Sequence, residues 1–343
     1  MKLPIKYYIV FFLLAALGSC TIYRNVPIEV LQPKEITIPE GTNVGLLYRN
    51  FKYENDTLQN YFREDYEIKR DNRNYHLNID SIVILKTLHA IAYNLENENV
   101  VSNVKLLPIN TLPRITADKL APLPREVILN LGSSSGIQKI IVLETITYMY
   151  SHYSALVNGS ESAEVIMAGI WAVYDALTGV VVKHESLVDT LYWNSTTEDG
   201  RRILIPPRFT ALELAAETYA GNFVRKFTTS WETVQRILVI PPVQEFNLAA
   251  EYASENKWGE ALALWERYSS ERFGRLSVSA RFNVALAYEI LNDIDNALVW
   301  IDKALDQTRI YQNKEELRLV QNYHRILNQR KKEINQLQNT SNE

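Results

Sequence analysis

The feature that most constrains the fold is a run of three long predicted strands between residues 138 and 193. Each is longer than the about five or six residues of a common strand. Turn sequences separate them, Asn-Gly-Ser at 158–160 and Asp-Ala-Leu-Thr-Gly at 175–179, so an antiparallel meander is predicted. Apolar residues fall on both faces, and we therefore expect helices to cover both faces of the sheet. The three predicted strands are residues 139–153, 164–175 and 179–193.

Length and charge set the broad class of the protein. A chain of 343 residues with 47% apolar residues has enough material for two domains, each with its own core. There are 36 Lys and Arg against 40 Asp and Glu, so no basic surface for nucleic acid is indicated. The single cysteine excludes an intrachain disulfide and a multi-cysteine metal site.

That cysteine ends a predicted secretory signal. Lys2 and Lys6 precede an apolar run, 7–17, which is too short for a membrane-spanning helix of about 20 residues. The sequence Leu-Gly-Ser-Cys at 17–20 then resembles a bacterial lipobox. The resemblance implies cleavage before Cys20, diacylglycerol on its sulfur and acylation of its new amino group. The alternative is an ordinary cleavage site that happens to contain a cysteine.

The residues after Cys20 bear on location. Thr21 follows the cysteine and no acidic run comes after it, which by analogy with known sorting rules predicts an outer-membrane lipoprotein that faces the periplasm. The predicted membrane contact is through acyl chains on Cys20. Residues 20–43 are predicted to be a lipid-anchored spacer and edge strand, because Pro33 and Pro39 interrupt the alternating pattern.

Residues 44–242 are predicted to form an α+β domain, sandwich-like, with a mixed sheet that contains the long antiparallel meander. The order of elements, with Asp-x-x-Thr-Gly at 175–179, resembles the small domains of CsgG-like and TolB-amino-terminal-like envelope proteins over residues 44–230. The segment 31–39 resembles uncharacterised envelope lipoproteins of Bacteroidota-type bacteria. Both resemblances imply an architecture without an activity. The other predicted elements are strands 44–51, 100–107 and 236–240, a helix from Asn78 or Asp80, a helix 125–131 ended by Gly132, and a helix from Pro206-Pro207.

The carboxy-terminal third has a helical repeat. The small and apolar residues of 248–265 recur 36 residues later, and this resembles tetratricopeptide repeats. Tyr268 stands where that family prefers alanine, and the usual proline near the end of each unit is missing. The predicted all-α domain is therefore residues 243–338, with a capping helix at 315–338. The remaining predicted segments are the signal peptide, 1–19, and a disordered tail, 339–343.

Four positions of the repeat are candidates for partner binding. Alignment on the repeat places Phe246, Ala250, Phe282 and Leu286 where the groove of such domains lies. None can donate a hydrogen bond from its side chain, so a clamp for a terminal carboxylate is not predicted. Two alternatives stay open. The apolar stripe takes a hydrophobic segment of a protein partner, or it is covered by the chain's own helix 315–338 or by the α+β domain.

No site for catalysis, cofactor or metal is predicted. The segment 132–136 matches G-x-S-x-G around Ser134, but a nucleophile elbow needs a strand before the serine and a helix after it. The predicted order is the reverse, which favours a loop that ends a helix. The five histidines have no metal-ligand spacing, and there is no glycine loop for phosphate.

These observations predict a lipid-anchored cell-envelope protein that acts as a protein–protein interaction or scaffold module without catalysis. One alternative is a serine hydrolase or glycan-processing envelope enzyme that uses Ser134 or an acid in a cleft. Another is a structural subunit of an envelope assembly complex.

Overall fold

The computed structural model describes residues 21–55, 61–70, 73–154, 160–196, 199–201 and 203–340, with the backbone alone at 73–78 and 340. The chain forms two compact units. We call residues 34–229 the sheet unit, and residues up to 33 together with those from 230 onward the helical unit. No helix of the described residues is long and apolar enough to cross a bilayer.

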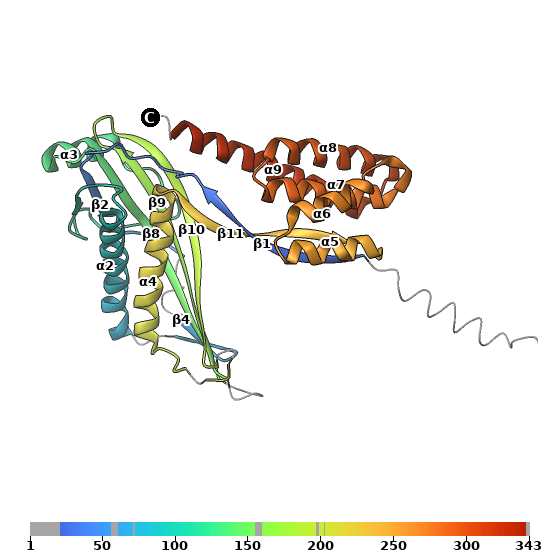
Figure 1. Cartoon of the computed structure of the whole chain (residues 1–343). Coiled ribbons are helices and arrows are strands. Elements are labelled where there is room, and N and C mark those ends of the chain that lie inside the picture. The colour runs from blue at the N-terminus through green and yellow to red at the C-terminus, as the bar shows by residue number, and fades with distance from the viewer. Residues whose placement is uncertain are drawn as a thin grey trace, which may run out of the picture. The chain divides into compact units, whose positions relative to one another are not determined.

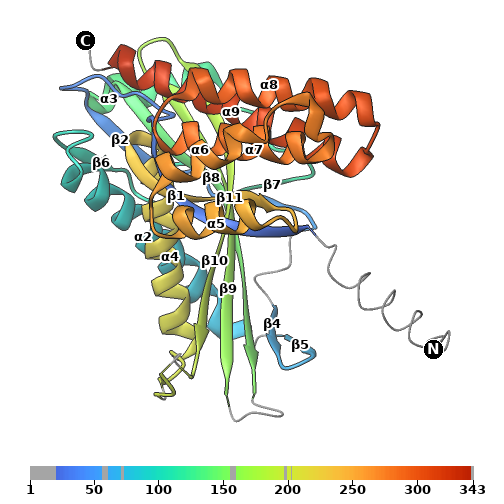
Figure 2. The same ribbon diagram turned by 45° about the vertical axis from the view of Figure 1, so that its right-hand side comes forward.

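The sheet unit contains a seven-stranded mixed sheet with the order β10-β9-β8-β2-β6, to which β4 and β5 add at β8. β2 is parallel to β6 and β8, whereas β8, β9 and β10 are antiparallel, as Figure 2 shows. The predicted α+β class with a mixed sheet and a long meander is confirmed. The strands are β2 Val44–Tyr48, β4 Tyr61–Glu64, β5 Glu67–Arg70, β6 Val104–Leu106, β8 Lys139–Tyr153, β9 Ser162–Asp175 and β10 Val180–Asn194. A separate parallel pair is β3 Phe51–Tyr53 and β7 Ile115–Ala117.

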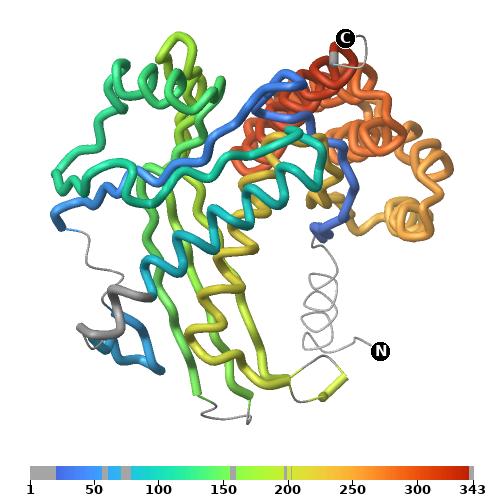
Figure 3. The backbone as a smooth tube through the Cα atoms, turned by 90° about the vertical axis from the view of Figure 1, so that its left-hand side faces the viewer, coloured from blue at the N-terminus to red at the C-terminus, as the bar shows by residue number. Residues whose placement is uncertain are grey.

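Two helices cover one face of this sheet, α2 (Arg73–Asn97) and α4 (Arg208–Val224), seen in Figure 3. The centre of this core is aromatic. The rings of Trp171 and Phe223 stack with centroids 4.2 Å apart, and the Trp171 indole donates a hydrogen bond of 2.9 Å to the Tyr219 hydroxyl. Burial of large aromatic groups, each with its polar atom satisfied, fixes how α4 lies on the strands.

The opposite face is covered only in part. The helix α3 (Arg125–Ser135) lies near a core of Ile140, Val142 and Tyr174. Farther along β10, Val188 is 65% exposed. The expectation of helices over both whole faces is therefore wrong among the described residues, because the side chains of β10 alternate between half-buried and exposed along its length.

Gly132 does not end α3, contrary to the prediction. The helix continues to Ser135 and ends at Gly136, whose φ of 67° is in the left-handed region that favours glycine. Gly132 is instead buried inside the helix. A Cβ there would lie 2.8 Å from the carbonyl oxygen of Ala176, so glycine is needed for close packing against the turn after β9.

The turn between β9 and β10 is built on one carboxylate. Asp175 Oδ1 accepts hydrogen bonds from the backbone N–H groups of Leu177 (3.0 Å) and Thr178 (2.9 Å), and Lys139 Nζ donates to Oδ2 at 2.8 Å. The hydrogen bond from Lys139 is the main reason that the pKa of Asp175 falls from 3.8 to about 2.

This depressed pKa predicts a pH dependence of stability. A carboxyl with a lower pKa in the folded state stabilises the fold above its unfolded pKa, near about 4, and that contribution is lost as the pH falls towards about 2. We expect the urea midpoint of the wild type to fall in this window by more than that of Asp175→Asn. An equal fall of the urea midpoint with pH in the two proteins would contradict the role of Asp175.

The helical unit begins with a two-stranded ribbon. β1 (Ile22–Gln32) pairs antiparallel with β11 (Ser230–Ile240), and five helices then pack one against the next (Figure 1). The structure therefore divides the chain differently from the predicted domains. The segment predicted as a spacer and edge strand contains β1, and this strand groups with the helices. β11 also groups with the helices instead of with residues 44–242. The helices are α5 Gln244–Ser254, α6 Trp258–Arg267, α7 Arg275–Ile290, α8 Ile294–Tyr311 and α9 Lys314–Thr340.

The predicted capping helix is confirmed as α9, which is longer than expected at both ends and includes residues 339 and 340 of the predicted tail. The resemblance of these helices to tetratricopeptide repeats stays a prediction. The predicted signal peptide, Cys20 and residues 341–343 lie outside the described residues.

Candidate functional site

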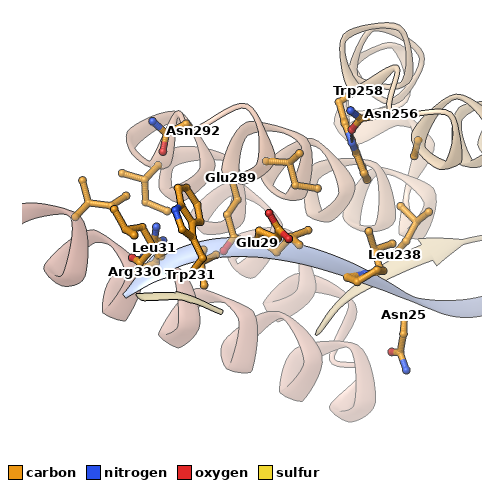
Figure 4. Close-up of a pocket in the computed structure, with 18 of the residues that line it drawn as sticks. Asn25, Glu29, Leu31, Trp231, Leu238, Asn256, Trp258, Glu289, Asn292 and Arg330 are labelled. Carbon is orange, nitrogen blue, oxygen red and sulfur yellow. Dashed lines mark hydrogen bonds between the residues drawn. The ribbon is translucent and has the colours of Figure 1, made fainter. Parts of the chain in front are cut away.

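A groove of about 810 Å³ runs along β1 in the helical unit. Its walls are residues 24–31 of β1, the last turns of α9, and the ends of α5 and α7. Figure 4 shows Trp231 and Arg330 towards one end and Trp258 towards the other, so the groove follows the direction of the strand. Its size is within the range of about 300–1,000 Å³ that is usual for ligand sites.

The direction of the backbone groups of the ribbon follows from contacts at both of its outer edges. On β11, the Val239 N–H donates to Asn283 Oδ1 at 3.0 Å, and Asn283 Nδ2 donates to the Val239 carbonyl at 2.7 Å. The N–H and C=O of Val239 therefore point away from β1. This direction alternates along a strand, and Tyr23 pairs with Val239. The backbone N–H and C=O groups of the odd-numbered residues of β1 therefore also point away from the partner strand.

A second contact agrees with this assignment. Arg330 Nη1 of α9 donates a hydrogen bond of 2.6 Å to the carbonyl of Leu31, an odd-numbered residue of β1. The same guanidinium lies 3.2 Å from Glu333, so the contact to the strand end is held by a paired side chain. Residues 24–31 of β1 line the groove, and they include the outward-pointing Asn25, Pro27 and Glu29.

One residue of the groove wall, Glu289, belongs to a buried ion pair. Arg236 on β11 contacts Glu289 at the end of α7 through two nitrogens, Nε at 2.9 Å and Nη2 at 2.7 Å. The Tyr323 hydroxyl donates to Glu289 Oε2 at 2.7 Å, and burial, with the nearby Glu289, raises the Tyr323 pKa well above its usual value. The charge of Glu289 is thus neutralised within the wall, which leaves this part of the groove without a free charge.

The four positions predicted to bind a partner are buried. Phe246, Ala250, Phe282 and Leu286 are each at most 2% exposed. Phe282 packs against Tyr323 of α9 with ring centroids 4.8 Å apart, so at this position the chain's own helix covers the stripe. Phe246 packs instead against Tyr268, with ring centroids 5.4 Å apart. Only Ala250 of the four lines the groove.

The other predicted candidates do not come together as a site. Ser134 lies in α3, where its hydroxyl donates to the Leu131 carbonyl at 3.3 Å, and a strand follows this helix, so the order needed for a nucleophile elbow is not present around it. His152 lies 3.8 Å from Glu161, and His184 is exposed on β10. Among the residues that the structure describes, no group of three possible metal ligands occurs.

Sequence reasoning missed the groove because its walls come from three distant segments of the chain. Its local signal was the alternation of Val26, Ile28 and Val30, which the sequence assigned to an edge strand without a partner. That alternation gives the strand, while the pairing with β11 is a long-range contact that no local pattern specifies.

Comparison with known proteins gives a family but no activity. Residues 42–238, more than half of the chain, match the family described as Domain of unknown function (DUF8603). The chain belongs to this DUF8603 family. Residues 247–329 match a second family, described as Domain of unknown function (DUF6340). The DUF8603 match ends before α5, and the DUF6340 match covers most of α5 to α9. No curated protein matches the chain.

Two solved structures resemble parts of this DUF8603 protein. One is a dodecamer of a leucine-to-methionine variant of PelC from Paraburkholderia phytofirmans, with 10% identity over 60% of this chain and 100% of that chain, at a TM-score of 0.24. Another is a PelC dodecamer from the same organism, with 12% identity over 59% of this chain and 97% of that chain, also at 0.24. At these TM-scores neither likeness carries an argument about fold or function.

Proposed function

We propose that this DUF8603 protein is a lipid-anchored cell-envelope protein that acts as a protein–protein interaction or scaffold module and catalyses no reaction. The observation that supports this most is the groove along β1, which is elongated and mainly apolar. Trp231 at its end is 68% exposed, and an exposed aromatic side chain beside a groove is typical of protein-binding surfaces. The proposed location is the outer membrane, with the protein facing the periplasm.

The anchor and the groove are close in the chain. β1 begins at Ile22, two residues after Cys20, and two extended residues span about 7 Å. Acyl chains on Cys20 would therefore hold the start of β1 near the bilayer surface. In this proposal the partner is an envelope protein that reaches the groove from the same membrane.

The lipid anchor predicts that mature protein begins at acylated Cys20 and sediments with membranes. Cys20→Ala removes the sulfur that carries diacylglycerol, so we expect this variant to stay unprocessed or to become soluble. Mass spectrometry of the amino-terminal peptide from the native envelope checks the prediction. An unmodified thiol at Cys20 would contradict the lipid anchor.

The interaction role is tested by photo-crosslinking in cells. A photoreactive residue at Leu337, which lines the groove, is expected to give a product with a protein partner. That product should decrease strongly when Trp231→Ala is added. The matched control is the same probe at Ile310, which is 68% exposed on α8 and is not among the groove residues. The same products from both positions, or no effect of Trp231→Ala, would reject the groove as the partner surface.

A further inference from the structure

We propose that the groove binds an extended peptide segment of a protein partner, which adds to the outward edge of β1 as a further strand. This inference rests on the proposed interaction function and specifies the chemistry of the partner. The elements that carry it are the unpaired outward backbone groups of Asn25, Pro27 and Glu29 and the apolar lining beside them.

The free part of the β1 edge is short and defined. The N–H and C=O groups of Asn25 and Glu29 and the C=O of Pro27 point away from β11, and none of them hydrogen-bonds another described residue. At the far end Arg330 already occupies the Leu31 carbonyl. An added strand from Asn25 to Glu29 would therefore span five residue positions, about 17 Å, and would satisfy these groups.

The side chains of an added strand would alternate between two environments. Residues on the same face as Val26, Ile28 and Val30 would point to the side of the helices, because neighbouring strands share their faces. The groove lining on that side includes Ala253 and Leu337, which offer apolar contacts. The partner segment should therefore carry apolar residues at every second position and polar residues between them.

Pro27 favours a single peptide over a second copy of this chain as the occupant of the groove. A proline in the middle of an edge removes one donor and opposes continuous pairing with a long strand. Together with the Arg330 cap, it leaves an edge that fits a short segment. An acyl chain could use the apolar lining but would leave the backbone groups of Asn25 and Glu29 unpaired.

The probes are synthetic octapeptides of alternating valine and threonine, used with the full mature protein, and binding is followed by fluorescence anisotropy. Two isomers are N-methylated, one at every valine and the other at every threonine, so that each lacks donors on one edge only. We expect the unmethylated peptide to bind. One isomer should bind at least about tenfold more weakly than the unmethylated peptide, and the affinity of the other should lie within about threefold of it. Equal affinity of the two isomers would overturn strand addition, as would no binding of the unmethylated peptide at about 1 mM.

The protein side is tested with proline. Because the Asn25 N–H points away from β11, Asn25→Pro should keep the ribbon and its hydrogen-exchange protection, as Pro27 does naturally, yet weaken peptide binding at least about tenfold. The matched control is Thr233→Pro, whose N–H points outward on the other edge of the ribbon and should leave the affinity unchanged. Peptide binding that Asn25→Pro leaves unchanged, or equal losses in both variants, would overturn the proposal.

The two levels of the proposal can fail separately. If the peptides do not bind but the Leu337 crosslinks still depend on Trp231, the interaction function stands and strand addition is wrong. Loss of the crosslinks with retained peptide binding would instead show an edge that accepts strands without the proposed cellular partner.

Discussion

Replacing Glu144 with alanine is expected to destabilise the sheet unit by about 3–5 kcal/mol. Glu144 is 1% exposed and Arg49 is 6% exposed, and Arg49 Nη1 lies 2.5 Å from Glu144 Oε2. Without the carboxylate, the guanidinium stays buried with its charge uncompensated. The Tyr174 hydroxyl, which donates to Glu144 Oε1 at 2.7 Å, would also lose its acceptor.

The pair fixes a loop to the sheet. Glu144 lies at an irregularity in β8 between Leu143 and Thr145. Arg49 also donates to the carbonyl of Ala121 at 2.5 Å, and the Tyr174 hydroxyl accepts the N–H of Leu123 at 3.0 Å. The loop before α3 therefore depends on the same buried network, and we expect its hydrogen exchange to speed up in Glu144→Ala.

Urea unfolding with hydrogen-exchange mass spectrometry measures the two units separately. Glu144→Gln keeps a hydrogen-bond acceptor but loses the charge, so we expect a smaller loss of stability than in Glu144→Ala. The exposed pair of Glu64 and Lys69 provides a control, because removing a solvent-exposed ion pair with Glu64→Ala should change stability by at most about 1 kcal/mol. A loss below about 1 kcal/mol for Glu144→Ala would contradict the role of the buried pair.

The parts of the fold that could be predicted have local signals. β8, β9 and β10 each carry long apolar patterns, and Asp175 with Gly179 gives the turn its chemistry within five residues. The Pro206-Pro207 pair likewise marks the start of α4 at Arg208. In each case the residues that determine the structure are neighbours in the chain.

The rest depended on contacts between distant residues. Nothing in residues 22–32 specifies that they pair with 230–240, so the ribbon, and with it the groove, could not be predicted. The role of Gly132 could not be predicted for the same reason, because the residue it packs against, Ala176, is distant in the sequence. The predicted binding stripe had the right residues for a helix interface, but burial of Phe282 by α9 is a tertiary contact.

Phe282→Ala is expected to destabilise the helical unit by about 3–5 kcal/mol, because it removes a buried aromatic side chain and leaves a cavity. Phe282 is 2% exposed, and its ring packs on Tyr323, the same residue that donates a hydrogen bond to Glu289. A cavity here would therefore loosen α9 as well as α7. Phe246→Ala should have a similar effect, since Phe246 is 1% exposed and packs on Tyr268.

Stability and crosslinking together distinguish a covered stripe from an open one. Val299→Ala is the control, because Val299 is 47% exposed on α8 and its truncation should cost at most about 0.5 kcal/mol. If the stripe is covered, Phe282→Ala lowers the urea midpoint of the helical unit, and crosslinks at Leu337 decrease only where the unit unfolds. A Phe282→Ala protein that keeps its stability and loses its crosslinks would show that this side chain contacts the partner directly.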